Sequence, residues 1–326
     1  MLADSIFSIK NETDFEQLAL RIFRHQYINN LTYQRFCNLL GITKTSINKI
    51  TDIPYLPIEF FKHYKIVSTT SPIKQVFTSS GTTGSITSKH HVTDLNIYEA
   101  SFNKGFEYFY GDIKEYTVLA LLPSYLEREG SSLVYMVDHL IKASQTAESG
   151  FYLNDTEALI SKLKQLTSKN KKIVLIGVSF ALLDLVEQHS ISLNPNTIVM
   201  ETGGMKGRRK ELIRPELHQI LQKGFTISQI HSEYGMTELL SQAYSTGNGI
   251  FKCPPWMKTS IRSTEDPLSN LGNNKTGGIN VIDLANINSC SFIATMDLGK
   301  VYNDGSFEIL GRFDHSDIRG CNLMAL

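Results

Sequence analysis

The chain has 326 residues, of which 41% are hydrophobic and 20% are charged, so it is long and apolar enough to bury a large globular core. Lys and Arg together number 32 and so do Asp and Glu, which gives a formal net charge of zero. This balance argues against nucleic acid or anionic lipid as the main partner, because both attract a basic surface.

The location of the protein is indicated by its first residues, its apolar runs and its cysteines. Residues 1–5 contain no basic segment followed by an apolar run, and no apolar stretch reaches the length of a membrane span. We therefore expect a cytoplasmic protein with no membrane span. Cys37, Cys253, Cys290 and Cys321 lie far apart and form no CxxC pair, so neither a disulfide framework nor a zinc site is expected.

The first 65 residues are predicted to form a helical N-terminal part. Between residues 13 and 40 apolar side chains recur at helical spacing, which predicts two amphipathic helices. Residues 53–62 include Pro54 and Pro57 and are predicted to be an extended apolar connector. It leads to a predicted strand at residues 73–77.

A loop made of glycine and hydroxyl residues follows this strand: Ser79, Ser80, Gly81, Thr82, Thr83 and Gly84. Glycine lets the main chain approach a ligand closely, and successive N–H groups can surround an anion such as a phosphate. The loop is not a Walker loop, because no Gly-Lys-Ser or Gly-Lys-Thr follows at the required spacing. On residue types alone, a solvated polar turn is the simpler interpretation.

Charged and imidazole groups follow the loop. Lys89 could reach back to a phosphate, although a solvated lysine is an equally good interpretation. The pair His90-His91 could be half of a metal site, but no carboxylate cluster lies nearby in the sequence. We therefore give the histidine pair little weight.

The middle of the chain, residues 66–245, is predicted to be an α/β core. Apolar runs at 116–122, 172–177, 197–200 and 225–230 alternate with helical patterns at 131–143, 155–168, 180–188 and 208–222. This alternation predicts a mostly parallel sheet flanked by helices on both faces. In such sheets ligands bind beyond the carboxyl ends of the strands, where Ser124, Gly177, Gly203-Gly204 and Tyr234-Gly235 would share one edge.

Residues 246–326 are predicted to form a smaller β-rich part. Runs at 278–282 and 291–295 are typical of strands, and residues 301–310 predict a hairpin in which Asp304-Gly305 supplies the turn. The polar segment 262–275 is predicted to be a loop. We expect one domain over residues 1–326, divided into parts 1–65, 66–245 and 246–326.

Three further stretches carry candidate chemistry. In residues 233–238 a hydroxyl and a carboxylate, Thr237 and Glu238, could hold a phosphate and its Mg²⁺. Asp297 could accept hydrogen bonds from the two hydroxyls of a ribose, and Arg312 could meet the same sugar or the phosphate. Taken singly, these residues are also explained as a capped helix start, a turn residue and a surface ion pair.

The order and separation of the four stretches resemble the signature series of the adenylate-forming superfamily. That superfamily includes acyl-CoA synthetases, phenylacetate-CoA ligases, peptide-synthetase adenylation domains and firefly luciferase. Residues 53–62, 122–125 and 319–321 are most similar to the acyl-protein synthetase branch. The namesake of that branch is the synthetase component of the fatty-acid reductase that supplies aldehyde in bacterial bioluminescence. The resemblance covers residues 50–326.

The resemblance implies that ATP and Mg²⁺ convert a carboxylic acid, expected to be a fatty acid, to an acyl-AMP with release of pyrophosphate. The loop from Ser79 to Gly84 would hold the phosphates. Thr237 would contact the α-phosphate and Glu238 would bind Mg²⁺. The remaining roles would be adenine binding by Gly203, Gly204, Tyr234 and Gly235, and ribose binding by Asp297 and Arg312.

One feature departs from the wider superfamily. Most members continue into a small mobile C-terminal domain that carries an adenylation lysine, whereas fourteen residues follow Arg312 here. We expect that domain to be absent from this chain. Lys89 would then substitute for its lysine, or the first step would be slow, or activity would be lost.

The resemblance also implies an acyl acceptor. In the acyl-protein synthetase branch a cysteine near the C-terminus receives the acyl group as a thioester, and Cys321 occupies that place. A thiolate is a good nucleophile towards a mixed anhydride, although a structural cysteine remains the alternative. An acyl-CoA reductase, an acyltransferase or a carrier protein would be the partner. The alternatives are a carboxylate ligase acting on coenzyme A or a carrier protein, like phenylacetate-CoA ligase, and a non-catalytic acyl- or nucleotide-binding subunit.

Overall fold

Two β-sheets form the frame of the protein in a computed structural model that describes residues 2–80, 86–123, 130–203 and 212–313. The larger sheet has six strands in the order β5-β4-β6-β7-β8-β9. Its strands are parallel except β9, which runs antiparallel to β8. The strands are β4 (Thr117–Leu121), β5 (Gly150–Phe151), β6 (Ile173–Val178), β7 (Thr197–Thr202), β8 (His231–Tyr234) and β9 (Ala243–Ser245).

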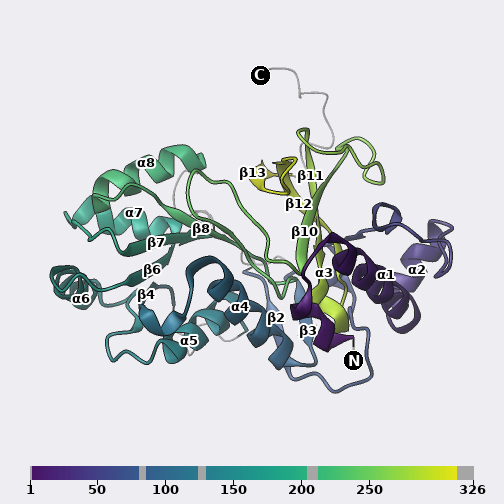
Figure 1. The fold of residues 1–326 in the computed structure, drawn as a ribbon, viewed down its shortest axis with the longest axis horizontal. Helices are drawn as coiled ribbons and strands as arrows, with labels where there is room; N and C mark the ends of the chain where they lie inside the picture. Colours follow the sequence, from purple (N-terminus) through teal and green to yellow (C-terminus); the bar gives the residue numbers. More distant parts are fainter. Residues whose placement is uncertain (1, 81–85, 124–129, 204–211, 314–326) are drawn as a thin grey trace.

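Helices cover both faces of this sheet, because its central strands are apolar on both sides. Every residue of β4 and β6 is buried, as expected for parallel strands between two helical layers. In Figure 1, α7 and α8 lie on one face and α4 and α5 on the other. The helices are α4 (Leu95–Tyr110), α5 (Ser132–Ser144), α6 (Thr156–Ser168), α7 (Ser179–Gln188) and α8 (Arg214–Phe225).

Side-chain caps fix where several helices begin. Asp94, Ser131 and Asp155 each accept a hydrogen bond from a backbone N–H in the first turn of α4, α5 and α6. Such caps satisfy N–H groups that have no partner within the helix. Residues 131–133, at the N-terminus of α5, lie near Thr202 and Gly203 at the end of β7.

The second sheet is built mainly from the C-terminal part of the chain. Strands β10 (Met257–Arg262), β11 (Thr276–Asp283), β12 (Phe292–Val301) and β13 (Phe307–Arg312) pair antiparallel in sequence order. The short strand β1 (Leu56–Pro57) adds to β12 in parallel. Figure 1 shows this sheet beside the large one.

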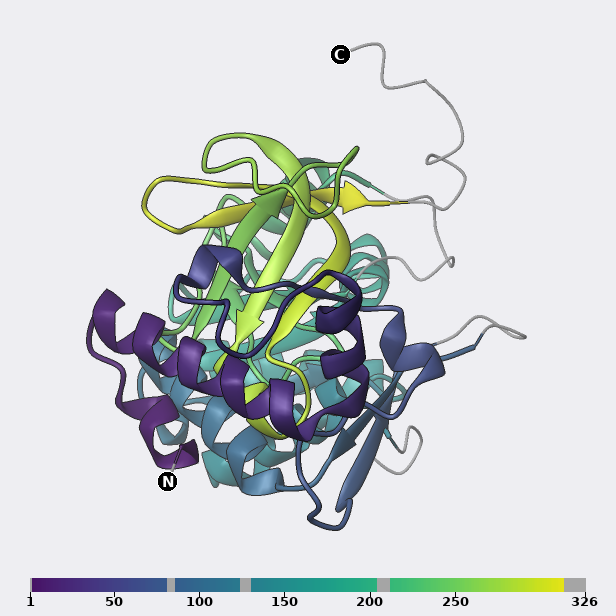
Figure 2. The ribbon, with the colours of Figure 1, turned by 90° about the vertical axis from the view of Figure 1, so that its right-hand side faces the viewer.

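The N-terminal helices pack on the second sheet. Helices α1 (Glu12–Asn29) and α2 (Leu31–Leu39) lie in front of the C-terminal strands in Figure 2. Buried Gln26 of α1 donates to the backbone oxygens of Asn286 and Ile287, at 2.9 and 3.1 Å. The predicted parts 1–65 and 246–326 therefore pack against each other. The boundaries at residues 65 and 245 stay a prediction.

Short elements complete the fold. A two-stranded hairpin of β2 (Gln75–Thr78) and β3 (Lys89–Val92) carries the glycine- and hydroxyl-rich loop. The remaining elements are α3 (Phe60–His63) and the 3₁₀ helices η1 (Ala3–Ser8), η2 (Ile50–Asp52), η3 (Ile113–Glu115) and η4 (Leu284–Asn288). No helix among the described residues is long and apolar enough to cross a membrane.

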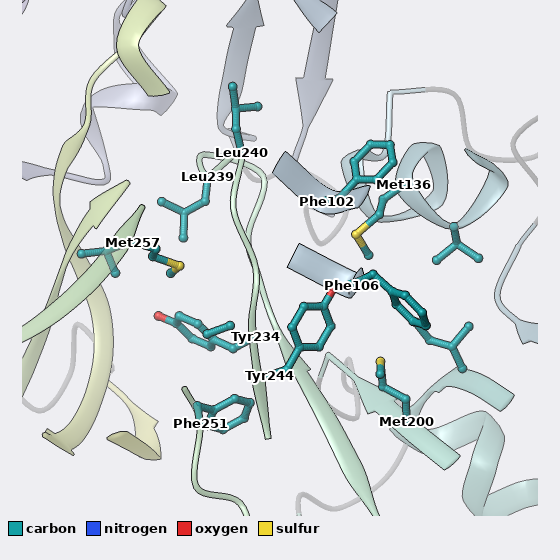
Figure 3. Packing of buried hydrophobic residues seen from close by; sticks show 14 of the residues in the cluster. Phe102, Phe106, Met136, Met200, Tyr234, Leu239, Leu240, Tyr244, Phe251 and Met257 are labelled. Carbon is teal, nitrogen blue, oxygen red and sulfur yellow. The ribbon is translucent and has the colours of Figure 1, made fainter. Parts of the chain in front are cut away.

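An aromatic layer joins the two sheets. Figure 3 shows Tyr234 and Tyr244 between Met257 of β10 and Phe102 and Phe106 of α4. These side chains belong to one continuous core. The strand β8 and the segment that follows it are therefore held from both sides, which fixes the positions of residues 233–242.

The α/β class, the parallel sheet and the β-rich C-terminal part are confirmed, and two local predictions are corrected. The strand predicted at 225–230 is wrong, because Thr226 adopts a left-handed conformation (φ 57°) that ends α8, and β8 begins only at His231. The second half of the predicted connector 53–62 contains α3. Helix α4 and strands β3 and β10 had no predicted counterpart.

Candidate active site

A cavity of about 160 Å³ lies beyond the carboxyl ends of β7 and β8, next to the N-terminus of α5. This is the edge of the parallel sheet at which the sequence predicts a ligand. Four predicted site residues line it: Ser80, Gly203, Gly235 and Thr237. Residues from three motifs that are far apart in the sequence therefore meet at one hollow.

The β2–β3 hairpin fixes one wall of the cavity. The backbone N–H of Ser79 donates to Ser88 O at 3.1 Å, and the N–H of Ser88 donates to Ser79 Oγ at 3.0 Å. Thr78 N–H donates to Gly130 O at 2.8 Å. The base of the loop is thus held by two main-chain bonds and one bond to a side chain, while Gly81, Thr82, Thr83 and Gly84 lie outside the described residues.

The turn after β7 forms a second wall. Gly203 has a φ of 68°, a left-handed conformation that glycine adopts without strain. Its carbonyl oxygen accepts a hydrogen bond from Ser179 Oγ at 2.6 Å. Glu201, two residues earlier, pairs with Arg214 Nε at 3.1 Å. Contacts from α7 and α8 therefore hold the backbone at Gly203 in place. Gly204 lies outside the described residues.

Thr237 is positioned through its backbone. Its carbonyl oxygen lies 2.9 Å from Nδ1 of the buried His90. Burial lowers the pKa of His90 to about 4, so the ring is neutral at pH 7, and Nδ1–H is the donor in this bond. His90 therefore supports the Thr237 segment, which is a role that the sequence did not indicate.

Glu238 is buried next to Thr237 and is not among the residues that line the cavity. Burial raises the pKa of its carboxyl, and a hydrogen bond from Ser88 partly offsets this. The described residues contain no group of three or more His, Cys, Asp or Glu side chains that could hold a metal ion. Of the described residues, Glu238 alone would therefore offer a carboxylate to a cation beside Thr237, and oxygens of a bound phosphate would supply further ligands.

A second cluster joins the end of β8 to the C-terminal hairpin. Tyr234 Oη donates to Asp297 Oδ2 at 2.7 Å. Asp297 and Arg312 are paired residues of β12 and β13, with Arg312 Nε at 3.7 Å from Asp297 Oδ1. Burial raises the pKa of Asp297, while the Tyr234 bond and the charge of Arg312 lower it.

The cavity and the cluster of Tyr234, Asp297 and Arg312 meet at residues 234–238. The Tyr234 ring packs against Phe251 and Phe307, and its neighbour Gly235 lines the cavity. The charges of Arg312 and Asp297 act on the Glu238 carboxyl. Three of the predicted motifs therefore share one region of the molecule.

The two other predicted catalytic residues, Lys89 and Cys321, are not placed in the cavity wall. Lys89 is exposed at the start of β3, opposite Thr78, which does line the cavity. Cys321 lies outside the described residues, as do the predicted loop residues 81–84 and Gly204. Their roles stay predictions.

No role was predicted for Glu233, Gln242 or Thr202, although all three line the cavity. Thr202 Oγ1 donates to Glu233 Oε2 at 2.5 Å. Burial, helped by the nearby Glu201 charge, raises the pKa of Glu233 to about 7, although the hydrogen bond from Thr202 acts in the opposite direction. The position of Glu233 could have been predicted from the alternation of side chains along a strand. That alternation puts residues 233 and 235 on the side opposite Tyr234.

The fold is that of the adenylate-forming ligases. 2-Hydroxyisobutyryl-CoA ligase, solved with 2-HIB-AMP and CoA, is similar with a TM-score of 0.67 and 12% identity over 94% of this chain and 72% of that one. ATP-bound MatB from Rhodopseudomonas palustris has a TM-score of 0.56 and 17% identity. That match covers 75% of this chain, which spans about half of MatB (49%).

The family follows from the sequence match. The family model described as "Acyl-protein synthetase, LuxE" matches residues 7–325, and the chain belongs to this family. Relatives named long-chain-fatty-acid--luciferin-component ligase are 25% identical, in Vibrio harveyi over 94% of this chain and 87% of that protein, and in Aliivibrio fischeri over 98% and 92%. The class is thus that of ATP-dependent ligases that activate a carboxylic acid and transfer the acyl group to a protein. The predicted family and class are confirmed.

Proposed function

We propose that the cavity and the Tyr234–Asp297–Arg312 cluster together hold ATP and a carboxylic acid while the acyl-AMP forms. The observation that carries this proposal is the meeting of Ser80, Gly203, Gly235 and Thr237 at one cavity beside that cluster. A carboxylate oxygen would form a bond to the α-phosphorus, and the bond from that phosphorus to the bridging oxygen would break. Pyrophosphate leaves with the electron pair.

The phosphates are proposed to lie against the hydroxyl groups of the cavity. Thr78, Ser80 and Thr237 contribute these hydroxyls. The residues fit a phosphate because hydroxyl donors, fixed in place, stabilise charge that develops on phosphoryl oxygens. Thr237 is the proposed α-phosphate contact, and its position is fixed by the His90 bond to its carbonyl oxygen.

The ribose is proposed to lie at Asp297, and the adenine beside Gly203 and residues 234–235. The Asp297 carboxylate is mainly buried, and its contacts with Tyr234 and Arg312 orient it. A carboxylate held in this way can accept hydrogen bonds from two neighbouring hydroxyls. Arg312 is 71% exposed and could turn towards the sugar or the phosphate.

Glu238 is the proposed Mg²⁺ ligand. Its carboxyl is buried and has a raised pKa, so a cation beside it would stabilise the charged form. Mg²⁺ is commonly held by one or two carboxylates together with phosphate oxygens and water. When bound, the ion would neutralise charge on the phosphates. Lys89 remains the proposed substitute for the adenylation lysine.

Cys321 is the proposed acyl acceptor. Burial raises the pKa of the Cys37 and Cys253 thiols to about 12 and raises that of Cys290 as well, so these three stay protonated and unreactive at neutral pH. A thiolate at Cys321 would attack the acyl carbonyl, and the bond from that carbon to AMP would break. An acyl-CoA reductase, an acyltransferase or a carrier protein would then take the acyl group.

The relatives' names give long-chain fatty acids as their acids, and we propose a carboxylic acid of this general kind, with the cytoplasm as the location. Coenzyme A or a carrier protein as the direct acceptor, and an inactive binding subunit, are the alternatives. Pyrophosphate release with ATP, Mg²⁺ and a panel of fatty and aromatic acids distinguishes an enzyme from a binding subunit. Release with none of the acids would contradict the proposal.

A second experiment locates the acyl group. Intact mass of the denatured protein is expected to increase by the acyl mass, and the increase is expected to be lost in Cys321→Ala. Cys253→Ala is the matched control and is expected to keep the adduct, because burial raises the pKa of the partly exposed Cys253 and keeps its thiol protonated. An adduct that persists in Cys321→Ala, or one that never forms although pyrophosphate is released, would favour an external acceptor.

A further inference from the structure

Arg214 joins the two sheets beside the proposed nucleotide site. It is the first residue of α8, and its side chain is 27% exposed. A positive charge at the N-terminus of a helix is unfavourable, because the N–H groups there already carry positive partial charge. The helix itself therefore does not favour an arginine at this position, whereas the contacts of its side chain with other elements do.

One of these contacts is with the large sheet. Arg214 Nε donates to Glu201 Oε1 at 3.1 Å, and Glu201 is buried in β7, two residues before Gly203. Nε2 of the buried His218 lies 3.6 Å from the same carboxylate oxygen. A buried carboxylate needs such partners, because its charge is costly to remove from water. The Nε side of the guanidinium is thus fixed to the strand that leads into the Gly203 turn.

The other contacts are with the second sheet. Arg214 Nη1 donates to the backbone oxygen of Ile309 in β13, at 3.2 Å. The guanidinium carbon lies 5.0 Å from the centre of the Phe251 ring, a favourable arrangement of a cation over an aromatic face. That ring stacks on Phe307, the first residue of β13, with 5.4 Å between the ring centres. One planar group therefore connects the end of β7 with β13.

The strand that Arg214 holds carries part of the proposed ribose site. Arg312 lies on β13 directly opposite Asp297 of β12. Burial raises the pKa of Asp297, and the Tyr234 bond and the charges of Arg312, Arg262 and Arg214 lower it. Arg214 is thus close enough for its charge to act on Asp297, and it also fixes the backbone three residues before Arg312.

We propose that Arg214 is a positioning residue for the nucleotide, which holds β13 in a fixed place relative to the Gly203 turn. This inference rests on the proposed function, which puts the adenine beside Gly203 and the ribose at Asp297. One adenosine would then contact both sheets, so its affinity depends on their separation. Arginine suits this role because its rigid planar group donates in two directions at once, whereas the ammonium of lysine is a single point charge.

The test measures ATP binding. The Kd for ATP with Mg²⁺ is determined by isothermal titration calorimetry for the wild type and for Arg214→Met, and the Tm of each protein shows that it is folded. Arg214→Met is expected to raise the Kd about tenfold or more, the usual value of a hydrogen bond to a charged group. In pyrophosphate release, the KM for ATP is expected to rise with the Kd, while the KM for the acid stays within about twofold, because Arg214 acts on the nucleotide side.

Arg214→Lys separates positioning from neutralisation of the buried Glu201. A lysine keeps a positive charge beside Glu201, but it cannot reproduce the planar bridge to Ile309 O. Arg214→Lys is therefore expected to raise the Kd for ATP about threefold or more, and it decides the test if Arg214→Met does not fold. Arg24→Met, on the exposed surface of α1, is the control and is expected to keep the wild-type Kd.

A wild-type Kd for ATP in Arg214→Lys would overturn the inference, because charge alone would then suffice, and so would a wild-type Kd in Arg214→Met. Equal rises of the KM for ATP and for the acid would overturn it as well. These results leave the proposed function intact if the wild type releases pyrophosphate. If ATP binds but no acid supports release, the proposed function fails and the Kd values still decide the inference. A wild type that binds no ATP would overturn both.

Discussion

The Tyr234 hydroxyl connects two motifs at the scale of single residues, because it donates to Asp297 Oδ2 at 2.7 Å. Without it, the proposed ribose acceptor would lose one of the groups that orient it. We expect Tyr234→Phe to raise the KM for ATP about threefold to tenfold, the usual value of one hydrogen bond. Steady-state kinetics measure this, with Tyr108→Phe as the control because Tyr108 is exposed on α4. An unchanged KM in Tyr234→Phe would exclude this orienting role.

Glu233 gives a prediction for pH at the same scale. Burial and the Glu201 charge raise its pKa from 4.5 to about 7, so the folded protein holds a proton that the unfolded chain has already released. The stabilisation from that proton is complete below about pH 4.5 and is lost as the pH rises through about 7.

Replacing Glu233 with the uncharged Gln removes this dependence. The free energy of unfolding of the wild type is expected to fall by about 3 kcal/mol relative to Glu233→Gln between pH 4.5 and 7.5. Urea unfolding at a series of pH values measures the difference. Parallel curves for the two proteins would mean that Glu233 titrates normally.

At the scale of elements, one buried carboxylate at the end of β11 holds the segment that follows β8. Asp283 accepts hydrogen bonds from the backbone N–H groups of Leu240 and Ser241, at 2.8 and 2.9 Å, and from Ser241 Oγ at 2.6 Å. It also accepts from Ala285 N–H at 3.0 Å. The chain between Thr237 and Gln242 therefore depends on β11 for its path.

Asp283→Ala is expected to lower the free energy of unfolding by about 3 to 5 kcal/mol, because it leaves several buried donors unpaired. Denaturant unfolding measures the loss. Asp52→Ala, on an exposed 3₁₀ helix, is expected to change stability by less than about 0.5 kcal/mol. Similar losses in the two variants would show that the carboxylate is not an anchor.

Elements with a strong local signal were predictable from the sequence. Helices α1, α5 and α6 combine helical apolar spacing with capping residues, and β4 and β6 are continuous apolar runs. The strand predicted at 225–230 failed because its apolar residues include Phe225, which is buried as the last residue of α8, and Ile230, which is buried in the connection. Apolar residues alone do not distinguish a strand from a buried turn.

At the scale of the whole molecule, the site depends on contacts that span the chain. Tyr234 and Asp297 are 63 positions apart, and His90 and Thr237 are 147 apart. The sequence could indicate these residues only through a resemblance of motifs. It gave no role to Glu233 or Gln242, because their position at the cavity follows from the pairing of β8 with β9.

The central claim is that this cavity activates the acid, and it is tested most directly by pyrophosphate release in Thr237→Ala. The account predicts that removing this hydroxyl slows release about 100-fold with little change in Tm, while Thr264→Ala, in the exposed loop after β10, keeps the wild-type rate. Release by Thr237→Ala at the wild-type rate would contradict the account.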